Sequence, residues 1–473
     1  MCSTPIAGTG ANVARRGPAL MWPVLIAAFG AALLPLLPRF APALNIAVSA
    51  ATLAALAWPM ANDGWLRLDP LNTPLVLVAG VVGLATAIYS AAAPQEKTRQ
   101  YHAAFQLFCA ANLLALLADN LGLMWVAIEA ATLASVTMVA SQRGAAALEA
   151  AWKFFILCGV GIALALFGTV VLQMALPDAG LSFAALRASA ASADAGLLNL
   201  AFILLLVGYG TKAGLVPLHH WLPDAHAEGP LPITAMLSGL LLTTAMHAVL
   251  RAKAVVGGHP GVIAPGTFLL VLGVATLLLA AFSLWRRRDA RRLFAWSSIK
   301  HMGIAAIAFG LGGPAGNLAG LLHLLGHALI KSALFIGLGA AITLKGSQRM
   351  ADIGGLIASH PALGWGLGLA ALGAAGLPPF MLFASEFLLL TSAGRLVPWL
   401  LAPLLLGLLV GAAALIRATQ RLCLGPATPD AGPAPGLLVL VPLWALLVIA
   451  LAGTLAMPAP LVAMLRAAAE IPR

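Results

Sequence analysis

Runs of 18 or more apolar residues recur along the whole length of this 473-residue chain and constrain its fold more than any other feature. A run of that length is enough for a helix to cross the hydrocarbon core of a bilayer. Because the runs are continuously apolar and do not alternate with polar positions, they exclude a membrane β-barrel. Charged residues make up 9% of the chain, whereas soluble domains carry about 25%. The sequence therefore predicts an all-α polytopic membrane protein.

We expect about fourteen transmembrane helices and no linker long enough to fold as an aqueous domain. The predicted spans lie near residues 20–37, 42–60, 71–92, 103–118, 120–140, 152–176, 197–217, 231–250, 262–285, 293–312, 317–344, 361–390, 396–420 and 436–457. The stretch 1–20 is polar and lacks a signal-peptide layout, so both Met1 and Met21 are considered as the start of the chain.

Two of the spans contain helix breakers in mid-membrane, in the runs Tyr209–Pro217 and Gly373–Pro379. Pro217, Pro378 and Pro379 each remove a backbone donor, and in lipid the freed groups must be satisfied within the protein. A pair of interrupted spans at matching places predicts an inverted-repeat transporter. Two unrelated kinks are the alternative.

This pattern gives a division of the chain into four parts. We place two inverted five-helix repeats, each with a broken helix, at residues 103–253 and 262–420. An N-terminal segment with three flanking helices occupies 1–102, and a C-terminal helix and tail occupy 421–473.

The net charge of +11 comes from Lys and Arg scattered over the ends of the spans, which indicates membrane topology and not nucleic-acid binding. Placing the N-terminus outside puts more of these residues, including the run Arg286–Arg292, on the cytoplasmic side. We interpret that run as a snorkelling anchor at the lipid surface. Both termini are therefore expected outside.

Seven ionisable side chains lie within the apolar runs: Glu129, Lys212, Lys300, His323, His327, Lys331 and Glu386. A charge at the bilayer centre costs roughly 2.5–3.5 kcal/mol on insertion scales, so such residues are rare and usually face a bundle interior or a wet cavity. The simplest interpretation is a relay for protons or small cations.

Glu129 and Lys212 form the natural first pair of such a relay. Lys212 lies within the first broken helix, and Glu129 is the only carboxylate well inside a span of the first half. Desolvation favours the neutral lysine and a nearby carboxylate favours the charged one, so this pair could exchange a proton. A static structural ion pair is the alternative.

His323, His327 and Lys331 are spaced i, i+4 and i+8, which places them on one stripe of one helix. This stripe could conduct protons between the two halves, although one or both histidines could simply be hydrogen-bonded in a core. A metal site is disfavoured because no third ligand with suitable spacing is visible. Glu386 follows the second break and is the expected terminal charge.

Three further features are less decisive. Lys300 is either a relay member or a residue that snorkels towards the cytoplasm. His247, one turn after Thr243, could hold water. The string Pro217–His226 resembles a zinc motif, but its prolines and Trp221 favour a structured cytoplasmic turn. The four cysteines show no ligand-like spacing, and we expect neither metal nor cofactor.

Several of these runs together resemble a known family. The Lys212–Pro230 run with its PLHHWLPDAHAEGP core resembles the signature of the antiporter-like membrane subunits of respiratory complex I and Mrp-type antiporters. Supporting matches are WSSIKHMG at 296–303, HALIKSALF at 327–335 and GLPP at 376–379 with the following Ser385-Glu386-Phe387. The LDPLN run at 68–72 and the HALIKSALF form look most like component F of hydrogenase-4.

The resemblance implies that Glu129 and Lys212 are the family's ion pair, that His327 is a connecting residue and that Glu386 is the distal exit-side residue. It also implies a location in a bacterial-type inner (cell) membrane. Many complex I homologues carry a lysine where this chain has Thr243, and His247 is a possible substitute. The C-terminal length resembles the shorter subunit type.

We therefore expect a proton-translocating subunit of a redox-driven complex, without a redox or catalytic centre of its own. Its expected partners are other membrane subunits, a soluble redox arm and membrane lipids. Alternatives are an Mrp-type Na⁺/H⁺ exchange subunit, the membrane subunit of an inorganic-carbon uptake system, and a purely structural membrane anchor.

Overall fold

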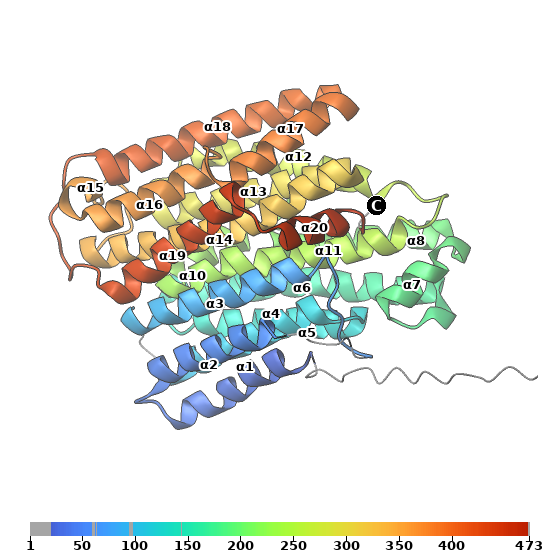
Figure 1. Cartoon of the computed structure of the whole chain (residues 1–473), viewed down its shortest axis with the longest axis horizontal. Helices are drawn as coiled ribbons and strands as arrows, with labels where there is room; N and C mark the ends of the chain where they lie inside the picture. Colours follow the sequence, from blue (N-terminus) through green and yellow to red (C-terminus); the bar gives the residue numbers. More distant parts are fainter. Residues whose placement is uncertain (1–19, 59–61, 63, 94–97, 143, 472–473) are drawn as a thin grey trace, which may run out of the picture.

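The computed structural model describes residues 20–58, 62, 64–93, 98–142 and 144–471. In these ranges the chain is helical throughout, with only three isolated β-bridges between loops. The helices run roughly parallel and antiparallel to one another in a single bundle (Figure 1). The apolar segments fold as helices because the N–H and C=O groups of a helix form hydrogen bonds within the helix and need no water.

Ten helical segments of the described chain are long and apolar enough to cross a membrane. They are α3 (Thr73–Ala92), α5 (Leu121–Val139), α6 (Ala145–Ala175), α8 (Ala195–Ala213), the segment Leu231–Val256, α12 (Pro265–Leu284), α13 (Ala290–Leu311), α14 (Gly313–Lys345), the segment Pro398–Leu424 and α19 (Leu437–Leu455). The chain is therefore a multi-pass helical membrane protein.

The remaining helices are shorter or more polar. They are α1 (Trp22–Leu33), η1 (Leu34–Leu36), α2 (Ala41–Leu56), α4 (Thr98–Leu117), η2 (Pro177–Ala179), α7 (Phe183–Ser189), η3 (Ala190–Ser192), α9 (Trp221–Glu228), α15 (Leu356–Ser359), α16 (Pro361–Ala374), α17 (Met381–Leu396) and α20 (Ala459–Ala469). Each of the fourteen predicted ranges coincides with a helix or with a pair of helices from these two sets.

Two of the long segments change their helical winding. The segment Leu231–Val256 consists of α10 (Leu231–Met236), the π-helical η4 (Leu237–Leu241) and α11 (Leu242–Val256). The segment Pro398–Leu424 consists of the 3₁₀-helix η5 (Pro398–Leu400), α18 (Leu401–Thr419) and the π-helical η6 (Gln420–Leu424). π-turns within α-helices are rare and occur frequently at functional sites.

The bundle has two ends, which we call the α15 end and the α7 end (Figure 1). The bridge between Asp289 and Arg349 lies at the α15 end, and the bridge between Asn120 and Ser182 lies at the α7 end. The described chain ends at the α7 end, where the amide of Asn317 donates to the carbonyl of Ala469 at 2.8 Å.

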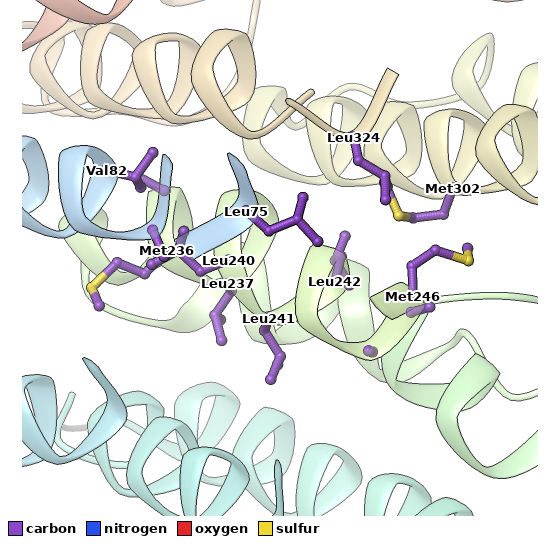
Figure 2. Close-up of a cluster of buried hydrophobic side chains, with 14 of the residues drawn as sticks. Leu75, Val82, Met236, Leu237, Leu240, Leu241, Leu242, Met246, Met302 and Leu324 are labelled. Atoms are coloured by element: carbon purple, nitrogen blue, oxygen red, sulfur yellow. The ribbon is translucent and has the colours of Figure 1, made fainter. Parts of the chain in front are cut away.

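The core lies around α14, α13 and the segment Leu231–Val256, which are almost entirely buried within the bundle. Figure 2 shows Leu237, Leu240 and Leu241 of η4 beside α3, between the second-half helices and the first-half helices drawn in cyan. Leu75 and Val82 of α3 and Leu324 of α14 pack in the same cluster. The helices that carry most of the ionisable residues are thus the most deeply buried ones.

Both predicted helix breaks are present. α8 ends at Ala213, the next residue Gly214 has φ +78°, and α9 begins at Trp221. α16 ends at Ala374, and Gly376, with φ +80°, lies in the gap before α17. Left-handed backbone of this kind is readily adopted only by glycine, so each break is built around a glycine as well as prolines.

The prediction of a turn at Pro217–His226 was wrong from Trp221 onwards. Residues 221–228 form α9, and Trp221, Leu222 and His226 are fully buried. The Trp221 ring stacks on Phe154 of α6 with centroids 4.4 Å apart, and its Nε1 donates to the carbonyl of Thr211 at 2.9 Å. Trp221 therefore satisfies a backbone carbonyl near the end of α8 and holds α9 inside the bundle.

Candidate functional site

Lys212, in the last turn of α8, meets Glu129 of α5 inside the bundle. Its Nζ lies 3.4 Å from Glu129 Oε2 and also donates to the hydroxyl of Thr132, one turn further along α5. The Lys212 side chain is fully buried, whereas Glu129 keeps 22% of its side-chain surface exposed. The predicted pair is brought together, and its lysine has two alternative acceptors on one helix.

Lys331, in the second half of the chain, is buried on α14. Its Nζ donates to the carbonyl of Phe294 at 2.6 Å and to the hydroxyl of Ser297 at 2.9 Å, both on α13. It also lies 5.0 Å from the centroid of the Phe335 ring. In the described part of the chain no carboxylate pairs with it, so neutral acceptors and ring faces surround this amine.

His327, one turn before Lys331, reaches the π-helical η4. Its Nε2 donates to the carbonyl of Ser238 at 3.1 Å. The Ser238 hydroxyl in turn lies 2.8 Å from that of Ser298 on α13. Gly239 allows α14 this close, because a Cβ there would collide with Ser332. η4 thus connects the first and second halves of the chain at the stripe.

His301 of α13 is a residue that sequence reasoning missed. Its Nδ1 lies 3.1 Å from Nε2 of His323, its ring centroid lies 5.4 Å from that of His327, and its Nε2 donates to the carbonyl of Ala374 at 3.0 Å. We call His301, His323 and His327 the histidine cluster. The available signal was the position of His301 beside Lys300, in the same span.

Glu386 of α17 completes this region beside the second break. Donor atoms of His301, His323 and Glu386 all lie within 4.8 Å of one another. Glu386 is buried, and its Oε1 has no hydrogen-bond partner among the described residues. Gly376 makes room for this carboxylate, because a Cβ at that position would collide with it.

Lys300 is fully buried and does not snorkel to the surface. Its Nζ is 3.5 Å from the carbonyl of Ala374, it interacts electrostatically with Glu386, and its stem packs against Gly411 of α18. The burial of Lys300 contradicts the interpretation that it snorkels, and its membership of a relay stays a prediction.

The trio of His301, His323 and Glu386 supplies the third metal ligand that the sequence did not reveal. Two imidazoles and a carboxylate suit a divalent transition metal. The buried amine of Lys300 interacts with the same carboxylate and would compete with a metal cation there. The donor set therefore fits a proton-sharing group better than a metal centre.

Hydrogen-bond accounting shows what the His301–His323 pair can do. A carbonyl only accepts, so His301 Nε2 carries a hydrogen and Nδ1 of the neutral ring has a lone pair. Ser385 Oγ lies 2.9 Å from His323 Nδ1 and 2.7 Å from the carbonyl of Leu382. When the hydroxyl donates to Leu382, His323 Nδ1 must be the donor to Ser385. Two lone pairs then face each other across 3.1 Å unless one extra proton lies between them.

When the Ser385 hydroxyl turns towards His323 instead, the neutral pair is satisfied. His323 Nε2 then carries the hydrogen and donates it to His301 Nδ1. The two arrangements differ by one proton and one hydroxyl rotation. The pair can therefore accept and release a proton without moving a helix.

His226 of α9 is a second residue that was missed, because its string was interpreted as a structured cytoplasmic turn. It is buried, its Nδ1 lies 2.8 Å from the carbonyl of Leu222, and its Nε2 has no partner in the described chain. Its ring centroid lies 5.4 Å from that of Phe335, the ring that also contacts Lys331. His226, from the first half of the chain, thus contacts the same ring as Lys331 from the second half.

His247 lies in a different network. Its Nε2 accepts from Nε of Arg251 at 3.1 Å, and Arg251 Nη1 is 2.6 Å from Asp69 Oδ2. Arg67, Asp69 and Arg251 line a cavity of about 340 Å³ at the α7 end. Thr243 donates to the carbonyl of Gly239 at 2.9 Å and offers no ionisable group.

Comparison with known proteins identifies the family. Residues 118–411 match the family described as NADH:quinone oxidoreductase/Mrp antiporter, TM. The chain belongs to this family. The matched region contains Glu129, Lys212, the histidine cluster and Glu386.

Individual relatives agree with this assignment. The chain is 46% identical over 381 residues to a hydrogenase-4 component F homolog of Methylacidiphilum infernorum, covering 77% of this chain and 80% of the relative. Several longer relatives are covered over only about half of their length.

Solved structures share the fold. One is a chain of the membrane-bound sulfane sulfur reductase, an archaeal respiratory membrane complex, with a TM-score of 0.86, 22% identity and 96% of each chain covered. Another is a chain of respiratory complex I from Thermus thermophilus, with a TM-score of 0.80, 25% identity, 93% of this chain and 99% of that chain covered. The fold is thus that of antiporter-like membrane subunits.

Proposed function

We propose that this chain is a proton-translocating subunit of a redox-driven membrane complex of the hydrogenase-4 or complex I type. The observation that carries the proposal is the set of buried titratable side chains on α8, α13, α14 and α17, together with the partly exposed Glu129 of α5. Each such group costs free energy to hold in a membrane, and a structural anchor would not need so many. The similarity to a hydrogenase-4 component F homolog supports a redox-driven partner.

In this proposal the chain works with other membrane subunits and a soluble redox arm. It supplies protonatable groups, and its partners supply the redox chemistry. A change in a neighbouring subunit alters the charge or position of Glu129, which is the partly exposed member of its pair. Coupling through charge requires no cofactor within this chain.

The proposed architecture has fourteen spans, with inverted repeats at residues 103–253 and 262–420. The breaks after α8 and α16 hold equivalent places in these repeats. Both termini lie outside, so the α15 end, with the run Arg286–Arg292, faces the cytoplasm.

The first step of the proposed route is exchange of Lys212 between Glu129 and Thr132. Beside Glu129 the ammonium is stabilised by the opposite charge. Beside Thr132 alone it is surrounded by neutral groups and releases its proton more readily. A shift of the carboxylate therefore controls the proton affinity of the lysine.

The second step crosses from the first half to the second through His226. Thr243 cannot carry a proton on this path, whereas His226 is buried beside the Phe335 ring, and its Nε2 has no hydrogen-bond partner among the described residues. From there the route continues to Lys331 and His327, and then to the His301–His323 pair and Glu386.

The function is tested by Lys212→Ala in the assembled complex in sealed vesicles. We expect redox turnover to retain at least part of its rate while protons moved per electron fall. Lys153→Ala is the matched control, because Lys153 is a half-exposed lysine of α6 that pairs with Glu149 and Asp224. Unchanged proton movement in Lys212→Ala would refute the proposal. Transport that requires sodium would favour the exchange subunit instead.

A further inference from the structure

Three arginines from three separate segments surround a pocket at the α15 end. Arg288 lies between α12 and α13, Arg349 follows α14, and Arg421 lies in η6. The pocket has a volume of about 570 Å³, which is within the range of sites for small molecules. The sequence suggested only a snorkelling anchor for this part of the chain.

The backbone holds these segments in register. The amide of Met350 donates to the carbonyl of Arg288 at 3.0 Å, next to the bridge between Asp289 and Arg349. The amide of Gly354 donates to the hydroxyl of Thr428 at 3.2 Å, which fixes the segment after η6. The three arginines are therefore presented by a connected frame and not by independent loops.

The positive charge of this pocket is not neutralised by the described chain. Asp289 caps α13, Asp352 accepts from the hydroxyl of Ser347 at 2.7 Å, and Asp430 pairs with Lys345 at 2.7 Å. Within the described residues, none of the three arginines has a carboxylate within 4.0 Å. Three unpaired guanidinium groups that converge on a pocket indicate an anionic ligand.

Beside this pocket, the C-terminal ends of α12 and α18, which pack against each other, line a second groove. This smaller groove shares Met350 and Arg421 with the pocket and is also lined by Trp285 and Arg417. The Arg417 guanidinium lies 5.6 Å from the Trp285 ring centroid. Trp285 is 43% exposed and Leu424 is 66% exposed. Aromatic and basic residues of this kind mark the level of lipid headgroups.

We propose that Arg288, Arg349 and Arg421 bind the phosphate of an anionic phospholipid whose acyl chains follow the groove between α12 and α18. The guanidinium fork matches phosphate oxygens, and basic pockets between membrane helices bind anionic headgroups. A free phosphate would use the arginines but not the groove. This site is independent of proton translocation and goes beyond the proposed function.

The test titrates the purified, delipidated full chain in detergent with phosphatidylglycerol, cardiolipin or phosphatidylcholine and counts bound lipids by native mass spectrometry. We expect the two anionic lipids to bind more tightly than phosphatidylcholine. In the triple variant R288Q/R349Q/R421Q this preference falls by about tenfold or more, since each lost charge-assisted bond is worth about 1.5–3 kcal/mol.

The control variant is R187Q/R395Q/R466Q, which removes the same charge at the α7 end and should keep the lipid preference. Thermal unfolding of both variants without lipid shows whether each remains folded. Equal binding of anionic and neutral lipid by the wild type, or an unchanged preference in R288Q/R349Q/R421Q, overturns the proposal. Displacement of bound phosphatidylglycerol by inorganic phosphate overturns it in favour of a free phosphate.

Discussion

His301 and His323, on adjacent helices, face each other nitrogen to nitrogen across 3.1 Å in the buried interior. The outer nitrogen of each ring is fixed, one by the carbonyl of Ala374 and the other by the hydroxyl of Ser385. The Ser385 hydroxyl can reverse its role from donor to acceptor, and the hydrogen of His323 then changes from one ring nitrogen to the other. The proton content of the pair is therefore linked to the rotation of Ser385.

Replacing Ser385 with Ala should slow proton translocation about tenfold, because one hydrogen bond to a charged ring is worth about 1.5–3 kcal/mol. The measurement is the initial rate of proton uptake into vesicles. Ser392→Ala is the control, because Ser392 lies on the same helix and donates only to the carbonyl of Leu388 at 2.7 Å. Equal rates in the two variants would contradict the role given to Ser385.

Gly376→Ala should both destabilise the protein and impair translocation. Its positive φ costs an alanine about 1–3 kcal/mol, and the added Cβ would displace the Glu386 carboxylate. Gly313→Ala imposes a similar backbone cost, at φ +66°, with nothing within 4 Å of the added Cβ. The midpoint of thermal unfolding should therefore fall by a similar amount in both variants, and only Gly376→Ala should lose proton movement. If Gly313→Ala loses as much, the defect reflects stability alone.

His226→Gln should reduce proton transfer between the halves by about 100-fold, the typical contribution of a positioned proton-transfer group. Glutamine retains hydrogen bonding but cannot take up a proton. His220→Gln is the control, because His220 is exposed at the same break. Proton movement per electron is the quantity to compare. Proton movement per electron in His226→Gln equal to that of the control would show that protons cross the centre elsewhere.

The Asp69–Arg251 pair predicts a pH dependence of stability. Burial raises the pKa of Asp69, but the charge and hydrogen bond of Arg251 outweigh it, so the pKa lies below its usual value. A carboxyl with a lowered pKa stabilises the fold above its unfolded-state pKa of about 3.9, and this stabilisation is lost as the pH falls through the folded-state value.

Asp69→Asn should therefore lower the free energy of unfolding at neutral pH by about 3–5 kcal/mol, the cost for a buried pair that loses one partner. The midpoint of thermal unfolding should fall accordingly. The difference from wild type should stay constant down to about pH 5 and shrink below about pH 4. Asp178→Asn, on an exposed 3₁₀ turn, should show no such difference. A gap that widens in acid would contradict the assignment.

The helices and their breaks were predictable because length, apolarity and proline act locally. The stripe of His323, His327 and Lys331 was also predictable, since helical spacing alone puts these residues on one face. The pairing of Glu129 with Lys212 followed from scarcity, because the first half offers no other carboxylate well inside a span. Each of these inferences needs only the sequence of one helix or the presence of one opposite charge.

The contacts between helices could not be predicted in this way. His301 follows Lys300 directly, and nothing in the sequence states which of the two faces α14. His226 was assigned to a structured cytoplasmic turn because of the prolines and Trp221, whereas the stacking of Trp221 on Phe154 draws α9 into the core. The nearness of Glu386 to the histidines depends on the path of the chain through the second break, which tertiary packing determines.

The five-residue π-turn at Leu237–Leu241 has a consequence for how this protein can vary. The carbonyl of Ser238, within this turn, accepts from His327, and Arg251 of the following α11 pairs with Asp69, so the turn sets the direction of both contacts on one continuous helix. Removing a single residue there would rotate all of α11 by about 100° relative to α10, since an α-helix has 3.6 residues per turn. Substitutions along this helix alter one contact at a time. A change in its length would disrupt the contacts of Ser238 and of Arg251 at once.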